Sequence, residues 1–137
     1  MLAALGVAVV ALDALHHGVH PTADPDDEPP AMAFPGPALA NLRLDARGLR
    51  GSFDQSALDR LQMLSLLRAH PDLDGDGQDD LDMDQLLYFG VSLGGLMGPP
   101  LMALEPDIGA GIYAVGGGKL SAFATDTEVV ASLAPVI

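Results

Sequence analysis

The amino-acid sequence predicts an α/β fold, specifically part of a three-layer sandwich in which helices cover a parallel sheet. Three runs of mainly apolar, strand-forming residues alternate with two stretches that have helical spacing. In chain order these are a strand at 6–13, a helix at 52–70, a strand at 86–91, a helix at 92–104 and a strand at 109–115. This alternation favours parallel strands joined by right-handed crossovers. The 137 residues can build one hydrophobic core, so residues 1–137 are interpreted as a single partial domain.

The first strand is predicted from the run GVAVVALD, which is nearly all apolar and rich in valine. Such a run is typical of a strand buried on both faces of a parallel sheet. A signal peptide is not favoured, because no basic residue precedes the run and Asp13 occupies the region where cleavage would be expected. The run is also too short to span a bilayer. Residues 14–40 are dense in proline, aspartate and glycine and are predicted to form a long irregular excursion.

The helix at 52–70 has a start signal, an apolar face and a stop signal. Ser52 precedes Gln55 by three residues, as in a capping box. Five apolar residues share one face at helical spacing: Phe53, Ala57, Leu61, Leu64 and Leu67. We expect the helix to end near His70, because the following proline disfavours the helical conformation of the residue before it.

The second half of the chain begins with an acidic loop at 71–84, after which the run LLYFGV predicts a buried strand. The next helix carries Pro99 and Pro100 in its interior, so we expect a kink or a split there. The run GAGIYAV predicts the last strand, and GGGK after it predicts a turn. A short helix is expected at Thr127–Leu133.

The charge balance excludes some classes of partner. Nineteen acidic residues against six lysines and arginines give a net charge of −13. Nucleic acids and anionic membranes are therefore not expected as partners, because the phosphate contacts that drive such binding would be repulsive. The chain has no cysteine, which excludes disulfides, thiolate chemistry and cysteine-based zinc sites.

The motif with the most chemical content is Gly90-Val91-Ser92-Leu93-Gly94, followed by Gly95, which fits the pattern G-x-S-x-G. Ser92 falls between a predicted strand and a predicted helix, which is the context of a nucleophile elbow. There the serine takes a strained backbone conformation, so the residue two positions before it and the residue two positions after it must be small. The turn would expose the Ser92 hydroxyl and direct the Leu93 amide toward an oxyanion. The alternative is a glycine-rich turn that only allows close packing of strand and helix.

Four segments, taken in order, resemble the nucleophile-elbow region of α/β-hydrolases, and more narrowly that of large bacterial lipases and esterases related to virulence-factor lipases. They are GVAVVALDALHHG, NLRLDARGLRGSFDQSALDRLQML, DLDGDGQDDLD, and YFGVSLGGLMG with ALEPDIGAGIYAVGGG behind it. The resemblance implies a partial α/β-hydrolase fold, Ser92 as nucleophile and the Leu93 amide as an oxyanion donor. It also implies an ester or lipid substrate, no cofactor for catalysis, and a parent protein that is secreted or located in the cell envelope. His17-Gly18 matches a His-Gly pair of the family that is not its general base.

The chain departs from the family pattern in three ways. The family's triad acid and histidine follow the serine, whereas all four histidines here precede it: His16, His17, His20 and His70. Asp107 and Asp126 are the only aspartates after Ser92, and neither has a histidine behind it. The second oxyanion donor and the central third strand of the family's sheet would lie before Met1. We therefore expect a core segment of a serine ester hydrolase that has little activity by itself, because a serine hydroxyl needs a base.

The acidic loop follows the opening of an EF-hand-like calcium loop. Its candidate ligands are Asp72, Asp74, Asp76, Gln78 through its backbone carbonyl, and Asp80, with Gly77 at the sharp turn. The twelfth position departs from the pattern, because Met83 stands where a bidentate glutamate is expected. Asp82 and Asp84 flank it and are the substitutes if the loop distorts. The alternatives are a structural calcium site or a solvated acidic connector.

Two further patterns are weighed against simpler interpretations. The group of His16, His17 and His20 suggests a metal cluster, but its loop-like spacing and the missing carboxylate favour a turn over zinc. The run AVGGGKL lacks the spacing of a phosphate-binding loop and is interpreted as a turn after a strand.

Two other functions remain open beside the ester hydrolase. One is a non-catalytic calcium-binding module with a vestigial elbow. The other is a piece that pairs through an exposed strand edge with missing parts of the parent chain or with another copy of itself.

Overall fold

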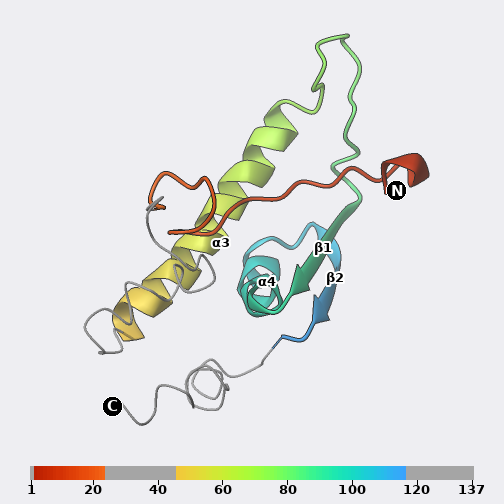
Figure 1. Cartoon of the computed structure of the whole chain (residues 1–137). Coiled ribbons are helices and arrows are strands. Elements are labelled where there is room, and N and C mark those ends of the chain that lie inside the picture. Colours follow the sequence, from red (N-terminus) through yellow and green to blue (C-terminus); the bar gives the residue numbers. More distant parts are fainter. Residues whose placement is uncertain (1, 24–45, 117–137) are drawn as a thin grey trace.

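The computed structural model describes residues 2–23 and 46–116, and these form a small α/β unit. Its elements are a short 3₁₀ helix η1 (Ala3–Leu5), α3 (Ala46–Ala69), β1 (Leu86–Val91), α4 (Leu93–Leu104) and β2 (Ile108–Ala114). β1 and β2 form a two-stranded parallel sheet, and α4 is the crossover between them. Figure 1 shows α4 between α3 and the two strands, and α4 contacts all three of these elements. The α/β class and the parallel pairing are thus confirmed.

Residues of the two strands alternate between the sheet face toward α4 and the opposite face, and the register pairs residues of the same face. Phe89 pairs with Ile112 and Gly90 with Tyr113, with one irregularity between Leu86 and Leu87. Tyr88 and Tyr113 lie on the face toward α4, where their ring centroids are 6.0 Å apart. Burial alternates along β1, so the strand is covered on one side only, whereas the sequence predicted a fully buried strand.

Two small clusters of buried residues hold the layers together. In the first, Leu64 of α3, Leu101 of α4 and Ile108 of β2 are buried against one another. In the second, Ala14 and Met97 are buried, and Phe53 packs against them. The predicted apolar face of α3 is confirmed, because Ala57 and Leu64 are both buried.

The predicted strand at 6–13 is wrong for this structure. These residues have no strand assignment, and Val9 and Val10 are 68% and 48% exposed. A strand needs a neighbour to satisfy its backbone groups, and β1 and β2 are the only paired strands among the described residues. Residues 14–23 are irregular, as expected, and the rest of the predicted excursion lies outside the described residues, as do residues 117–119 and the expected helix at 127–133.

The start of α3 also corrects a prediction. The helix already includes Ala46, so Ser52 lies inside it rather than at its N-terminus. The Ser52 hydroxyl donates a hydrogen bond to the Gly48 carbonyl, at 3.2 Å. A serine in a helix interior can bond to the carbonyl four residues earlier, so the capping-box pattern occurred here without a cap. The C-terminal end at Ala69, just before His70, agrees with the prediction.

Of the kink or split expected at the two prolines, the split does not occur. α4 runs as one helix from Leu93 to Leu104 and contains both Pro99 and Pro100. Met97 and Leu101 are buried on either side of the prolines. Packing on both sides therefore holds the helix together despite the two missing amide donors. Within the described part of the chain, no helix is long and apolar enough to cross a membrane.

Candidate functional site at the β1–α4 turn

Ser92 forms a sharp turn between the last residue of β1 and the first residue of α4. Its backbone has φ 53° and ψ −114°, a combination that L-residues rarely adopt. Only two other non-glycine residues in the described ranges have a positive φ, His16 and Val115. Such a conformation costs about 1–3 kcal/mol and persists only where the surroundings enforce it. Ser92 is exposed and its hydroxyl does not cap α4.

The surroundings that enforce this turn are mainly backbone groups. The Ser92 amide donates a hydrogen bond to the Ala114 carbonyl at the end of β2, at 2.9 Å. The next amide, of Leu93, belongs to the first turn of a twelve-residue helix, where amides have no intrahelical acceptor. No described residue accepts a hydrogen bond from it. The Leu93 amide is therefore available to an oxyanion beside Ser92, with the positive end of the helix dipole behind it.

The glycines of the motif do not all have the same role. A Cβ atom on Gly90 would lie 2.4 Å from the Gly94 carbonyl oxygen, which leaves no room for any side chain. A Cβ atom on Gly95 would lie 2.8 Å from the Cα of Gly116, two residues after the end of β2. A Cβ atom on Gly94 would meet only the Tyr88 hydroxyl, at 3.7 Å. The close approach thus requires Gly90 and Gly95, whereas the sequence pattern had assigned it to Gly90 and Gly94.

Tyr88 of β1 connects this strand to the first turn of α4. Its hydroxyl donates a hydrogen bond to the Gly94 carbonyl, at 2.6 Å. Burial raises the pKa of this phenol, so it stays protonated and remains a donor at neutral pH. Sequence reasoning missed this contact, although a tyrosine four residues before the serine is a usable signal.

The histidine side-chain contacts found among the described residues do not involve Ser92. The His20 Nε2 atom lies 3.8 Å from Asp59 on α3, and its Nδ1 atom accepts from Thr22. The His16 side chain contacts the Thr22 carbonyl, and His70 follows the end of α3. Within residues 2–23 and 46–116, no hydrogen bond or ion pair joins a histidine to Ser92.

The His17-Gly18 pair belongs to a turn that Asp13 organises. The Asp13 carboxylate accepts a hydrogen bond from the Val19 amide, at 2.9 Å. Gly18 has φ 59°, and a Cβ atom there would lie 2.2 Å from the same carboxylate. The turn interpretation of this region is therefore confirmed. The residues His16, His17 and His20 do not form a group that could hold a metal ion together.

Asp107, one of the two aspartates after Ser92, has a structural partner. Arg68 of α3 donates to Glu105 at 2.8 Å and to Asp107 at 3.1 Å. Glu105 is 8% exposed, and the hydrogen bond from Arg68 holds the pKa of its carboxyl below the ordinary range. This three-residue cluster joins α3 to the α4–β2 connection and was not predicted from the sequence. Asp126 lies outside the described residues.

The acidic loop brings three of its five predicted ligands together. Carboxylate oxygens of Asp72, Asp74 and Asp80 lie within 4.8 Å of one another, which is a spacing that could hold a metal ion. Asp72 accepts hydrogen bonds from the amides of Gly75 and Gly77. These bonds lower the pKa of the Asp72 carboxyl, so it is ionised at neutral pH.

The carboxylate of Asp76, also a predicted ligand, lies outside this group, and the backbone carbonyl of Gln78 stays a predicted ligand. The Asp76 carboxylate accepts a hydrogen bond from the Gln78 amide, at 2.8 Å. Met83, at the twelfth position, packs against the buried cluster around Leu64. Asp82, one of the flanking substitutes, accepts from the Asp84 amide at 3.1 Å.

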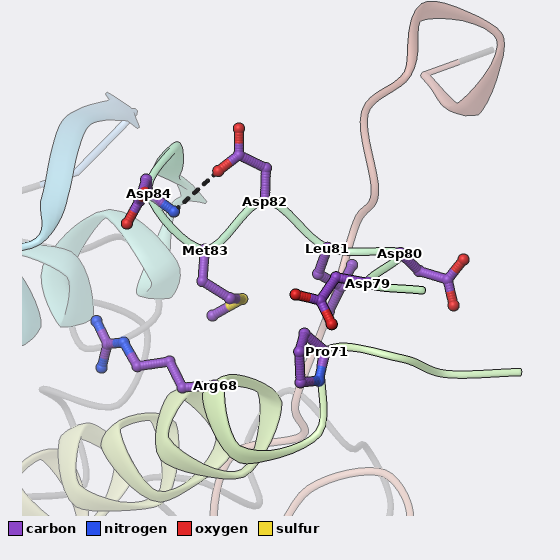
Figure 2. Close-up of a pocket in the computed structure, with 8 residues that line it drawn as sticks. All are labelled: Arg68, Pro71, Asp79, Asp80, Leu81, Asp82, Met83 and Asp84. Carbon is purple, nitrogen blue, oxygen red and sulfur yellow. Dashed lines mark hydrogen bonds between the residues drawn. The ribbon is translucent and has the colours of Figure 1, made fainter. Parts of the chain in front are cut away.

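An open cavity of about 540 Å³ lies beside the acidic loop, between it and the end of α3 (Figure 2). Its lining residues are Arg68, Pro71, Asp79, Asp80, Leu81, Asp82, Met83 and Asp84. The carboxylates dominate the lining, so the cavity is strongly acidic. None of its lining residues belongs to the turn at Ser92.

Comparisons with known proteins identify no relative of this chain. No family model matches the chain, and neither the curated proteins nor the solved structures contain a significant match.

Proposed function

We propose that the chain is the elbow segment of a serine ester hydrolase of the lipase or esterase type, with Ser92 as its nucleophile. The observation that carries the proposal is the strained backbone of Ser92 between a strand and a helix. A turn that served only close packing would have no need of an exposed hydroxyl in a conformation that glycine adopts at lower cost. The exposed hydroxyl and the unbonded Leu93 amide lie side by side, as nucleophilic attack with oxyanion binding requires.

The proposed chemistry is acyl transfer. The Ser92 oxygen attacks the carbonyl carbon of an ester, and the π electron pair moves to the carbonyl oxygen, which the Leu93 amide binds. A base takes the hydroxyl proton and returns it to the leaving alkoxide, and water then releases the acid from the acyl-enzyme. The base, its acidic partner and the second oxyanion donor come from sequence other than these 137 residues. The chain by itself therefore retains only the contribution of the turn and its helix.

That contribution is measurable because one oxyanion donor is worth about 10²–10³ in rate. We expect a fluorophosphonate probe to modify Ser92 at least about 10-fold faster than Ser65, an exposed serine on α3 whose hydroxyl donates to the Leu61 carbonyl. The adducts are quantified by mass spectrometry of the intact chain and its peptides. The Ser92→Ala variant must lose the fast adduct and keep the slow one. Equal rates at the two serines would overturn the proposal.

A second candidate function, calcium binding by the acidic loop, rests on the grouped oxygens of Asp72, Asp74 and Asp80. Three carboxylates supply part of the six to eight oxygens that Ca²⁺ takes, and backbone carbonyls or water would supply the rest. With a dissociation constant of about 0.1–1 mM, 10 mM calcium stabilises the folded chain by about 1.4–2.7 kcal/mol.

The test is thermal unfolding with 10 mM CaCl₂, with MgCl₂ as the ionic-strength control. We expect calcium to raise the melting temperature more than magnesium does, and Asp74→Asn to remove the difference. The Asp54→Asn variant makes the same charge change at an exposed position on α3, away from the acidic loop, and should keep the difference. Equal effects of the two salts would exclude a specific calcium site.

A further inference from the structure

The outer edge of β1 has no strand partner among the described residues and carries no residue that would protect it. β1 pairs with β2 along one side, and no described residue pairs with its other side. The strand reads LLYFGV, so its six residues include no charge and no proline. Soluble proteins usually protect such edges with lysine, proline, a bulge or a covering element. The one irregularity of this strand, at Leu86 and Leu87, lies in its pairing with β2 at the first residue.

The sheet face that points away from α4 is apolar and exposed. On β1, Leu87, Phe89 and Val91 are 76%, 68% and 49% exposed. Their register partners on β2 are Ala110, Ile112 and Ala114, and Ile112 is 63% exposed. Parallel sheets are almost always covered on both faces. The open edge and the open face therefore meet along β1.

We propose that β1 pairs with β1 of a second copy of this chain, antiparallel, about a two-fold axis at Phe89. The result is a continuous four-stranded sheet in the order β2, β1, β1, β2. A strand edge is self-complementary under such an axis, because each copy offers the other the same row of amides and carbonyls. This proposal concerns the outer edge of β1 and is independent of the reactivity of Ser92.

The register about Phe89 matches the side chains on both faces. On the open face Phe89 lies opposite its own equivalent, and Leu87 lies opposite Val91 of the second copy, which gives apolar cross-strand pairs. On the other face Tyr88 lies opposite Gly90 of the second copy, so a ring meets a residue without a side chain.

Charge favours a second copy in this orientation over a parallel one. Asp82 and Asp84 lie just before β1. An antiparallel arrangement puts these acids of the two copies at opposite ends of the interface, whereas a parallel one would put them side by side. The remaining repulsion between two chains of net charge −13 is screened by salt, so the dimer should strengthen as salt rises.

The first experiment measures the molar mass of the chain by analytical ultracentrifugation over a concentration series, at low and high salt. We expect a monomer–dimer equilibrium that shifts toward the dimer in high salt. Phe89→Lys places two like charges opposite each other and should weaken the dimer at least about 10-fold. Leu58→Lys, on α3 and 49% exposed, makes the same charge change away from the edge and should leave the dimer intact.

The second experiment uses the absence of cysteine, since Phe89→Cys gives the chain a single thiol. Mild oxidation should give a disulfide-linked dimer, and Leu58→Cys should give far less. Circular dichroism checks that each variant is folded. A monomer at all concentrations and salt levels would overturn the proposal. So would equal effects of the two lysine variants or equal crosslinking of the two cysteine variants.

Discussion

Replacing Gly90 with alanine, and separately Gly94 with alanine, separates two positions that the G-x-S-x-G pattern treats alike. At Gly90 the new methyl group would lie 2.4 Å from the Gly94 carbonyl oxygen and 2.5 Å from its carbon. These are backbone atoms of the turn and cannot move aside as a flexible side chain would. At Gly94 the methyl group would meet only the Tyr88 hydroxyl, at an ordinary contact distance of 3.7 Å.

The expected changes in the free energy of unfolding have opposite signs. Inserting a methyl group into a filled space costs about 1–3 kcal/mol, and the backbone contacts put Gly90→Ala at the upper end, about 3 kcal/mol. Alanine is favoured over glycine inside a helix by about 0.5–1 kcal/mol, so Gly94→Ala should stabilise by about 0.5 kcal/mol in the first turn of α4. The two variants should differ by roughly 3.5 kcal/mol.

Thermal unfolding followed by circular dichroism at 222 nm measures this difference. At about 4 °C per kcal/mol for a domain of this size, the two melting temperatures should lie about 14 °C apart, with the unmodified chain between them. Urea unfolding checks that the slope of the transition is unchanged in both variants. If Gly90→Ala unfolds at the same temperature as the unmodified chain, or if Gly94→Ala is the less stable variant, the close approach at Gly90 is refuted.

Three further predictions concern other contacts. Ser56 is 1% exposed and its hydroxyl has no hydrogen-bond partner, so Ser56→Ala should stabilise by about 1 kcal/mol in urea unfolding; a loss of stability would contradict this. Tyr88→Phe removes the bond to the Gly94 carbonyl and should cost about 1 kcal/mol in the same assay, and an unchanged midpoint would count against that bond. The pKa of the Glu105 carboxyl is lowered in the folded chain, so this carboxyl binds a proton less readily there than in the unfolded chain. The stabilisation by Arg68 is therefore present above the ordinary glutamate pKa of about 4.3 and is lost as the pH falls below that value. Melting temperatures from pH 7 to pH 3 should therefore fall less steeply for Glu105→Gln, and parallel curves would show that this carboxyl does not carry the effect.

The parts of the fold that the sequence predicted well have local causes. β1 was predicted with its observed bounds and β2 within one residue, because each is a short apolar run between clear breakers. The end of α3 was set by a proline. The strand at 6–13 failed because strand formation depends on a neighbour that sequence patterns do not reveal. The split, one of the two outcomes expected at Pro99 and Pro100, does not occur because burial of Met97 and Leu101 outweighs the local cost of the two prolines.

In the candidate site, too, features with local causes could be predicted and features that depend on distant residues could not. The turn at Ser92 could be predicted, because the glycine spacing and the strand–helix context are both local signals. Which glycines are sterically required could not, because Gly95 is constrained by Gly116, a residue far along the chain. In the acidic loop the alternating aspartates indicated a cation site, and the loop brings the carboxylates of Asp72, Asp74 and Asp80 together but not that of Asp76, which the alternation alone does not reveal.

The hydrogen bond from the Ser92 amide to the Ala114 carbonyl makes the end of β2 a support of the Ser92 backbone. A displacement of residues 114–116 would pull on the serine backbone and would change the close contact between Gly116 and Gly95 of α4. A change in residues 114–116, which belong to neither β1 nor α4, would thus alter how the Ser92 hydroxyl and the Leu93 amide are aligned. Substitutions at Val115, which is 86% exposed and already has φ 53°, would therefore alter the backbone geometry of Ser92, and with it the proposed reactivity, without touching the serine.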